Sequence, residues 1–538
     1  MKKIKNSIKL SLATALLSLG ACTGDFYEKN TNPEEITDEM LDWDNLRIGS
    51  AFSQLAQNVF PTVQVSGSEE YGSSRYQVIQ DLAGNIFAGY TGVTNSQFVA
   101  NNLYDVQADT WYNFMHDDAF QRAMGPWTQL DAQRENSPEA VALADVLKVA
   151  VMHRVTDTYG PIAYLSVGNS GIRQTYDSQQ VVYNKFFEEL DNAITVLTDF
   201  YERTPSATIL ANYDPIYKGN VQAWIKFANT LRLRLAMRVV YADSALARAE
   251  ADAALANSVG LMTAASDIAQ FSKPASVTSW EYPLYMIQYS FNGGDSRVGA
   301  TIESYMNGYA DPRRATYFTA NSEGNYRGVR NGINVTEDYA PSALLSRVNC
   351  TNDDAIVWMK PAEAWFLRAE YELRWGTKTQ AGEYYRQGVN CSFSTEGVGG
   401  ADLYLADETS VPADYTDEIV SSNSTEALGT ITIAWDDVAD TETALERIIT
   451  QKYLAIFPDG QEAWSEFRRT GYPRIFPNVV NRQAGRISTA RQIRRLNFPS
   501  TEYATNATAV QAAITTLNQE SSNPTGDNGG TTLWWDKK

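Results

Sequence analysis

The residue whose surroundings most clearly specify a chemical reaction is Cys22. It follows Leu19, Gly20 and Ala21, and a Leu, two small residues and a Cys form the lipobox of bacterial lipoproteins. Cleavage before the Cys frees its amine, and the thiol carries diacylglycerol. Burial of acyl chains is worth about 0.8 kcal/mol per methylene, so several chains anchor a protein without a transmembrane helix. The alternative is an ordinary signal peptide with a chance Cys.

The residues before Cys22 have the pattern of a secretory signal peptide. Lys2, Lys3 and Lys5 precede an apolar run from Ile8 to Leu19, which is too short for the roughly twenty residues that span a bilayer. We therefore predict a signal peptide at 1–21 and a lipidated tether at 22–40, which is polar and contains Pro33. Acidic Asp25 and Glu28 fit the surface-export signals of some lipoproteins.

Residues that could form a catalytic site follow no recognisable pattern. The chain has two histidines, and the motifs HExxH, CxxC and GxSxG are absent. His153 lies in an apolar helical stretch, which indicates a hydrogen-bonded core residue. Among 64 acidic residues no spacing selects a carboxylate pair for glycoside cleavage. The turn at Asp527-Asn528-Gly529 lacks the later ligands of a calcium loop. We expect no enzyme, no metal and no cofactor.

Composition excludes some partners and leaves others open. The net charge is -20 and the pI is near 4.7, which argues against nucleic acid and anionic lipid surfaces, since both need clustered Lys and Arg. Cys350 and Cys391 remain after lipidation, either as a disulfide or as two buried thiols. Aromatic residues make up 12% of the chain, with 30 Tyr and 12 Trp. Tyr and Trp suit core packing and also stacking on sugar rings or peptide side chains.

Most of the readable periodicity is helical. Ser137-Pro138-Glu139 predicts a helix start, and Gly160-Pro161 its end. The spacing predicts helices at about 139–159, 178–197, 221–241, 244–256, 298–309, 361–375, 379–391 and 443–457. The predicted caps are Ser137, Asp177 and Asp243. The stretch 231–239 alternates like a strand, but its length favours a helix, and its arginines are expected to pair with acids. Arg468 and Arg469 are likewise expected to be structural.

The order of the elements predicts a mostly α chain. Helix pairs near 139–200, 221–257 and 361–393 have the size of a tetratricopeptide unit, and such units stack into an α-solenoid with long irregular loops and extra helices. The helical domain covers 41–538. Within it, 259–358 is rich in Gly, Pro, Asn and aromatics, which predicts a loop-rich insertion, and 395–440 is polar and loop-like.

Several segments, in order along the chain, carry a recognisable family pattern. The most specific is Asp214–Asn220 followed by Trp224–Ala236. The others are Lys29–Pro33, His153–Tyr164, Tyr176–Tyr183, Glu189–Ile194, Asp311–Arg313, Glu363–Glu370, Gly460–Pro473, and Arg494-Arg495 with Pro499, Glu502 and Asn506. Together these segments resemble the SusD/RagB family of outer-membrane nutrient-binding lipoproteins.

The resemblance implies a fold and a role. The family is an α-solenoid of tetratricopeptide-like pairs whose loops carry the ligand site. It binds glycans or peptides at the cell surface and sits as a hinged lid over a TonB-dependent transporter of SusC type, without catalytic machinery. We therefore expect a lipid-anchored protein of the outer membrane, facing the exterior, that captures a glycan for import. The alternatives are oligopeptide capture by the same mechanism, and a surface hydrolase or adhesion protein.

The family's sites place aromatics on loops outside the solenoid, so two irregular regions supply the candidate ligand contacts. The first holds Tyr90, Asn102, Trp111 and Tyr112, and the second holds Trp280, Tyr282, Tyr285 and Tyr289. Stacking on Trp and Tyr, with a few amide contacts, suits a neutral sugar. For each of these residues, packing in a loop or in the core is the competing interpretation.

Overall fold

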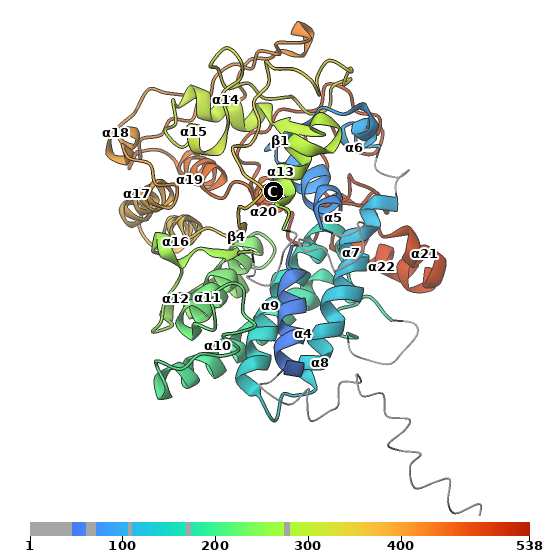
Figure 1. Ribbon diagram of the computed structural model, residues 1–538, viewed down its shortest axis with the longest axis vertical. Coiled ribbons are helices and arrows are strands. Elements are labelled where there is room, and N and C mark those ends of the chain that lie inside the picture. The colour runs from blue at the N-terminus through green and yellow to red at the C-terminus, as the bar shows by residue number, and fades with distance from the viewer. Residues whose placement is uncertain (1–45, 61–71, 106–109, 168–173, 274–279) are drawn as a thin grey trace, which may run out of the picture. The chain divides into compact units, whose positions relative to one another are not determined.

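The computed structural model describes residues 46–60, 72–105, 110–167, 174–273 and 280–538. The chain divides into two compact units, Met1–Gly49 and Ser50–Lys538. The predicted signal peptide, the tether and Cys22 lie outside the described residues. In the described part of the large unit most elements are helices (Figure 1). None of the described helices has the length and apolar character needed to cross a membrane.

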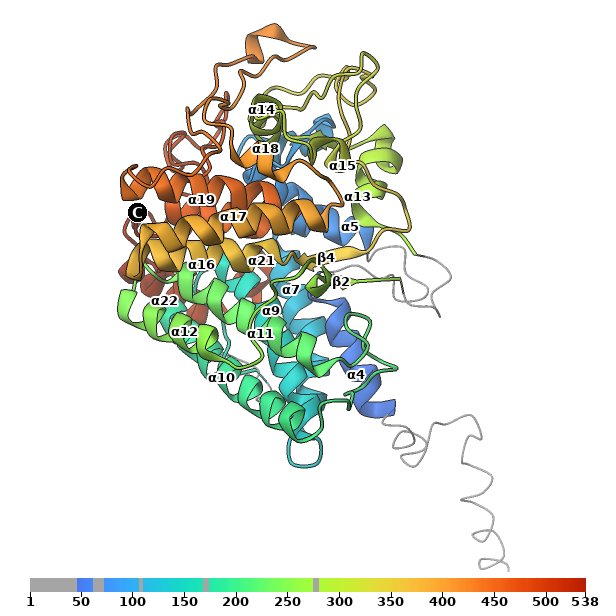
Figure 2. The same ribbon diagram turned by 90° about the vertical axis from the view of Figure 1, so that its left-hand side faces the viewer.

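The body is a stack of helix pairs. Figure 2 shows α10, α11, α16 and α19 following one another, with α12 beside α11 and α17 beside α16. Within the pairs, α9 contacts α10, α11 contacts α12, and α16 contacts α17. Contacts of α10 with α11, of α11 with α16, and of α16 with α19 join one pair to the next. The helices of the stack are α9 (Pro138–Tyr159), α10 (Gln179–Arg203), α11 (Val221–Arg238), α12 (Ser244–Ala256), α16 (Ala362–Trp375), α17 (Lys378–Thr395) and α19 (Thr441–Ala455). This confirms the prediction of a mostly α chain built from stacked helix pairs.

Shorter elements surround the stack. The helices are α4 (Leu46–Gln57), α5 (Ser73–Tyr76), η2 (Gln77–Asn85), η3 (Ser96–Phe98), α6 (Val99–Asn102), η5 (Thr110–Asn113), α7 (Phe114–Asp118), η6 (Ala119–Ala123), α8 (Met124–Asp131), η7 (Ala265–Asp267), α13 (Pro283–Tyr285), η8 (Met286–Ser290), η9 (Phe291–Gly293), α14 (Ala300–Gly308), α15 (Arg314–Tyr317), α18 (Ala401–Leu405), η10 (Ser421–Asn423), α20 (Gly460–Thr470), α21 (Ser500–Thr505) and α22 (Ala507–Glu520). The segments η2 and η8 are π-helical. Helix α20 packs against η2.

Two small antiparallel ribbons join distant loops. Strand β1 (Thr91–Val93) pairs with β3 (Ser296–Val298), with Thr91 opposite Val298 and Val93 opposite Ser296. Strand β2 (Ala269–Phe271) pairs with β4 (Ile356–Met359). The β1–β3 ribbon therefore holds the segment before α6 against the loops near residue 290.

Local sequence explains the helix starts, with two corrections. Asp243 caps α12 as predicted, since its Oδ1 accepts from Leu246 N at 3.0 Å. The predicted cap at Asp177 is wrong by one residue: Ser178 Oγ accepts from Val181 N at 3.3 Å, while Asp177 accepts from Leu165 N at 2.8 Å. Ser137 precedes α9, but its side chain makes no capping bond. Pro138 at the first helical position supplies the start there.

The ambiguous stretch 231–239 is helical through Arg238. Its apparent alternation arises because α11 is buried all round, so that apolar residues and arginines are both enclosed. Arg234 donates to Glu363 of α16 in a two-point contact of 2.8 and 2.5 Å. Arg238 donates to Glu462 of α20 at 2.6 Å and to Asp157 of α9 at 3.2 Å. The expected pairing of these arginines with acids is confirmed.

These pairs belong to a buried ionic network that links five helices. Lys452 of α19 lies 3.2–3.3 Å from Glu363, Glu462 and Glu466. Arg469 of α20 contacts Glu370 of α16 at 2.6 Å. Burial by itself raises the pKa of the Glu462 carboxyl, but the charges of Arg238, Arg234 and Lys452 hold that pKa well below its ordinary value. The network therefore stays charged and fixes how the pairs stack.

The cysteines and His153 are core groups. Cys350 and Cys391 are both free thiols, so the disulfide alternative is wrong. Burial raises the pKa of Cys350 to about 12 and that of Cys391 to about 11, which keeps both thiols protonated. His153 is buried, with Nδ1 3.0 Å from the carbonyl oxygen of Val149, as predicted.

Candidate functional site

A groove of about 850 Å³ is formed by three loop-rich segments. Figure 1 shows α5, α7 and α13 close together on this side of the stack, and contacts join α5 with α13 and α7 with η2. The residues lining the groove are Ser74, Arg75, Gln77, Val78, Phe98, Trp111, Phe114, Ser290, Phe291, Asn292 and Asp295. Its size lies within the range of small-ligand sites.

Aromatic side chains form one part of the groove. Trp111 is half-buried and packs against Phe98 with ring centroids 5.6 Å apart. The Arg75 guanidinium carbon lies 3.5 Å from the centroid of the Phe114 ring. Phe291 is half-buried on the facing segment. These rings offer flat apolar surface at an opening that water also reaches, as stacking on a sugar or an aromatic side chain requires.

Amide side chains organise the opposite part around one carboxylate. Asp295 is buried and accepts from Gln77 Nε2 at 2.7 Å, Asn95 Nδ2 at 2.7 Å and Asn292 Nδ2 at 2.9 Å. Asn292 has a left-handed backbone, with φ of 51°, a conformation that Asn tolerates because its side chain bonds locally. The result is a row of oriented amides, which can donate to and accept from hydroxyl or peptide groups.

Charge inside the groove is sparse. Arg75 and Asp295 are its only ionised lining side chains among the described residues. Arg75 Nε lies 3.7 Å from Asp118. Burial raises the pKa of Asp118, and the charges of Arg75 and Arg122 oppose that shift. A mostly neutral surface of rings and amides matches an uncharged polar ligand better than an ion.

Of the sequence candidates, Trp111 lines this groove. Tyr112 follows it but is buried, and the Tyr159 hydroxyl donates to its carbonyl oxygen. Tyr285 and Tyr289 lie just before the Ser290–Asn292 wall and stack on each other at 5.1 Å. The Tyr289 hydroxyl donates to the Val348 carbonyl at 2.7 Å. Both tyrosines are half-buried, so they adjoin the groove without lining it.

Three other candidates lie inside the protein. Tyr90 is 0% exposed, and its hydroxyl donates to the Tyr453 carbonyl at 2.5 Å. Trp280 stacks on Phe271 with the planes 3° apart, and its Nε1 donates to the Asp354 carbonyl at 3.2 Å. Tyr282 is also buried. In this conformation these side chains pack loops together and present no face to a ligand.

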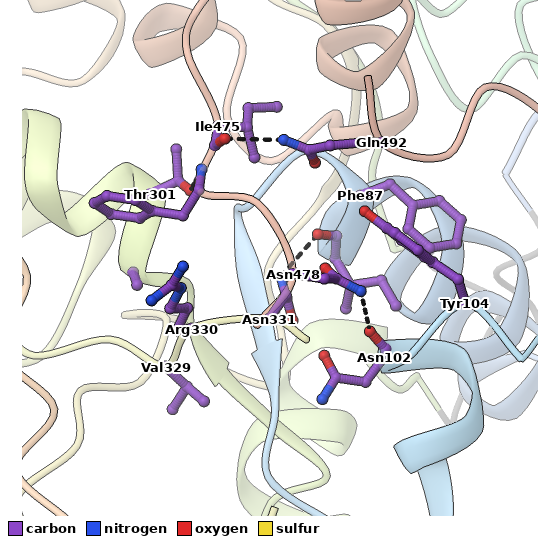
Figure 3. A pocket seen from close by; sticks show the side chains of 13 residues that line it. Phe87, Asn102, Tyr104, Thr301, Val329, Arg330, Asn331, Ile475, Asn478 and Gln492 are labelled. Atoms are coloured by element: carbon purple, nitrogen blue, oxygen red, sulfur yellow. Dashed lines mark hydrogen bonds between the residues drawn. The ribbon is translucent and has the colours of Figure 1, made fainter. Parts of the chain in front are cut away.

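Asn102 lies at a separate, nearly filled cavity of about 10 Å³. Its Oδ1 accepts from Gly332 N at 2.6 Å, and its Nδ2 donates to the Ile333 carbonyl at 3.0 Å. Its backbone carbonyl accepts from Asn478 Nδ2 at 2.8 Å (Figure 3). The space holds about one water-sized sphere. Through these hydrogen bonds Asn102 connects three loops in this structure.

Several groove residues are absent from the sequence candidates. They are Arg75, Phe98, Phe291, Asn292 and Asp295. Only Phe291-Asn292-Gly293-Gly294-Asp295 carries a local signal, because a Gly pair beside Asn marks a tight turn. The others were not readable, since the β1–β3 ribbon and packing between distant loops bring them together.

The family model described as SusD-like, Susd and RagB outer membrane lipoprotein, matches residues 28–536. No curated protein matches the chain.

Solved structures with the same fold cover nearly the whole chain. A chitin-binding SusD homologue from Flavobacterium johnsoniae has 37% identity, covers 91% of this chain and 98% of its own, and has a TM-score of 0.83. A SusD homologue from Bacteroides uniformis has 36% identity, covers 92% and 100%, and has a TM-score of 0.83. One from Bacteroides thetaiotaomicron has 37% identity, covers 91% and 99%, and has a TM-score of 0.80. On both grounds, this chain belongs to the SusD and RagB family of outer membrane lipoproteins.

Proposed function

We propose that this protein captures a glycan in the Trp111 groove at the cell surface and delivers it to a TonB-dependent outer-membrane transporter of SusC type. The observation that carries the glycan assignment is the pairing of half-buried rings, Trp111 and Phe291, with the amides around Asp295. Sugar rings have apolar faces that stack on aromatics and hydroxyls that bond to amides. A chitin-binding homologue among the similar structures supports a glycan as the ligand class.

The proposed anchor is the lipidated Cys22 after removal of 1–21. Membership of a family of outer membrane lipoproteins supports this anchor and a location at the outer membrane. The polar segment 22–40 then serves as the tether, and 41–538 as the SusD-like domain with its loop-rich insertion at about 259–358. A tether lets the domain face the exterior while the acyl chains stay in lipid.

Oligopeptide capture is the second proposal. Amides bond to a peptide backbone as well as to hydroxyls, and rings accept apolar side chains. The sparse charge of the groove favours neutral sugars, because a general peptide site would need partners for charged side chains and termini.

We propose that the protein is not an enzyme. Glycoside hydrolysis needs two carboxyl groups about 5–10 Å apart at the scissile bond. Among the described residues lining the groove, Asp295 is the single carboxylate, and three amides occupy its oxygens. A hydrolase acting at this groove would lack its second carboxyl group.

The test is calorimetric titration of the detergent-solubilised full chain with panels of neutral oligosaccharides and of oligopeptides. We expect saturable heat with at least one oligosaccharide and none with peptides. Saturation with peptides alone would select the second proposal, and turnover of any oligosaccharide would refute the binding role. Co-purification of a SusC-type transporter from outer membranes tests the partner.

A further inference from the structure

A second cavity, of about 360 Å³, lies between α8 and the segment around α21. Its lining includes His116, Phe120, Gly125, Thr128, Glu502 and Asn506. It shares no residue with the Trp111 groove. The volume falls at the lower end of small-ligand sites, so a compact molecule is the expected occupant.

One wall of this cavity is apolar. The rings of His116 and Phe120 lie with centroids 4.6 Å apart and planes tilted by 40°. Met124 and Ala163 extend this surface. A Cβ atom added at Gly125 would meet no atom within 4 Å. Gly125 is exposed and lines the cavity, so the absence of a side chain there leaves open space in the cavity.

The hydroxyl groups that line the cavity use their hydrogens within the protein, so they can accept hydrogen bonds from a ligand but not donate them. The Thr128 hydroxyl donates to the Met124 carbonyl at 2.9 Å, and the Thr505 hydroxyl donates to the Thr501 carbonyl at 2.9 Å. Both hydroxyl hydrogens are thus used within the protein, and only their lone pairs remain. His116 Nδ1 lies 3.1 Å from the Asp117 carboxylate, and in the neutral ring a hydrogen on Nδ1 leaves Nε2 as an acceptor.

Glu502 gives the cavity its charge. Its Oε2 accepts from the Tyr176 hydroxyl at 2.9 Å. Among the described residues no hydrogen bond to Oε1 is formed. Glu502 is also the single Lys, Arg, Asp or Glu in the described lining. The cavity therefore presents an uncompensated carboxylate, several lone pairs and an aromatic wall.

We propose that this cavity binds a small organic ammonium ion, with the ammonium group at Glu502 and a compact apolar body against His116 and Phe120. A carboxylate and lone pairs need a ligand with hydrogens to donate and a positive charge. A ring near the cation adds to the attraction. A zwitterionic amino acid fits less well, because its own carboxylate would find no cation in the lining. The proposal does not depend on glycan binding.

The probe is phenethylamine, titrated into the full chain in detergent at pH 7, with 2-phenylethanol as its neutral counterpart and phenylalanine as its zwitterionic one. We expect the amine to bind at least tenfold more tightly than either. Glu502→Gln should weaken amine binding about tenfold or more and keep the Tyr176 contact, because the Gln oxygen still accepts. Trp111→Ala should leave amine binding unchanged.

Gly125→Leu locates the site, because the added side chain fills the open space. It should abolish amine binding, while Gly399→Leu, at another glycine with nothing within 4 Å of its Cβ, should not. Binding of the alcohol as tightly as the amine, no binding of the amine, or unaltered binding in Gly125→Leu would each overturn the proposal. The ligand comparison uses the unmodified protein, so it holds even if a variant folds poorly.

Discussion

Trp535 donates its indole Nε1 to Oδ1 of Asp157 at 2.8 Å, across 378 residues of sequence. Asp157 lies near the end of α9, where Tyr183 of α10 also donates to Oδ1 at 2.6 Å and Arg238 of α11 contacts Oδ2 at 3.2 Å. Next to Trp535, Asp536 contacts Arg494 at 2.6 Å. Trp535 thus bonds to the α9–α10 helix pair at Asp157, a carboxylate that also belongs to the ionic network.

Removal of this contact should destabilise the whole body. Trp535→Ala leaves a large cavity and removes a donor from buried Asp157, so we expect a loss of about 3–5 kcal/mol in the free energy of unfolding. Urea denaturation followed by tryptophan fluorescence measures it. Deletion of the exposed Lys537 and Lys538 is the matched control and should cost less than about 1 kcal/mol. Equal effects of both changes would contradict a role for Trp535 in the core.

The buried pair of Arg234 and Glu363 should be costly to break from one side. Glu363→Gln removes one of the carboxylates that face Arg234 and Lys452, and breaking a buried ion pair from one side costs about 3–5 kcal/mol. The exposed pair of Arg386 and Glu383 gives the comparison, since Arg386→Ala should cost at most about 1 kcal/mol. The thermal unfolding midpoint of Glu363→Gln should therefore lie clearly below that of Arg386→Ala. A Glu363→Gln midpoint as high as that of Arg386→Ala would argue against a buried ionic network.

Glu303 should make stability fall as pH rises toward neutrality. Burial raises its pKa to about 7, against the lowering effects of Gly328 N and Arg327. The folded state thus binds the proton more tightly than the unfolded chain between pH 4.5 and 7. The stability that Glu303 contributes is full below pH 4.5 and is lost as pH rises through 7, by an amount on the order of 3 kcal/mol.

Glu303→Gln checks this contribution. Gln still accepts from Gly328 N, where the Glu303 contact measures 2.7 Å, but it cannot ionise. Urea denaturation across pH 4.5–7.5 should show a shallower decline for the variant than for the unmodified chain. Parallel curves for the two proteins would mean that Glu303 titrates alike in the folded and unfolded states.

Trp111→Ala should weaken binding of the oligosaccharide found by titration by about tenfold or more, which corresponds to about 1.4 kcal/mol. The reason is the loss of the ring that Phe98 supports at the groove wall. Trp375→Ala is a matched control, because Trp375 is also half-buried and packs on one ring, Tyr371, at 5.3 Å, outside the groove. Calorimetry with both variants should show the loss in Trp111→Ala alone. An affinity of Trp111→Ala equal to that of the unmodified protein would mean that Trp111 does not contact the ligand.

Cys22→Ser should release the protein from the membrane. The Ser hydroxyl cannot take the thioether-linked diacylglycerol, so the hydrophobic anchor is lost. We expect the variant in the soluble fraction without label from radioactive palmitate, while the unmodified chain is labelled and sediments with outer membranes. A labelled or membrane-bound Cys22→Ser would contradict the lipobox interpretation.

Helices with strong local signals could be predicted from the sequence. Helix α12 begins at Ser244 and ends at Ala256 as expected, because Asp243 is a local cap. Helix α22 was not predicted, since its buried stripe has only three residues, Val510, Ala513 and Leu517. The predicted capping bonds of Asp177 and Ser137 were wrong. The neighbouring Ser178 caps α10 in place of Asp177, and Pro138 starts α9 without a capping bond from Ser137. Local patterns thus place helices better than they assign single hydrogen bonds.

The ligand contacts were the part that local pattern could not decide. Tyr90 and Trp111 are both aromatic residues in irregular segments, yet one is enclosed beside Tyr453 and the other lines the groove. The difference depends on packing with segments hundreds of residues away. The tight turn before Asp295 had a local signal, but the contacts of Asp295 had none, because Gln77 and Asn95 reach it only through the β1–β3 ribbon.

By itself, the sequence determined the long helices, among them the one that carries the α11 arginines, and the chemistry expected at Cys22. Each follows from residues a few positions apart along the chain, where spacing alone fixes which groups share a face or meet an enzyme. The tertiary structure decided which rings and amides face the groove, where the final tryptophan lies, and that Cys350 and Cys391 remain separate. Exposure and contact between remote segments result from how the whole chain packs, which no local spacing encodes.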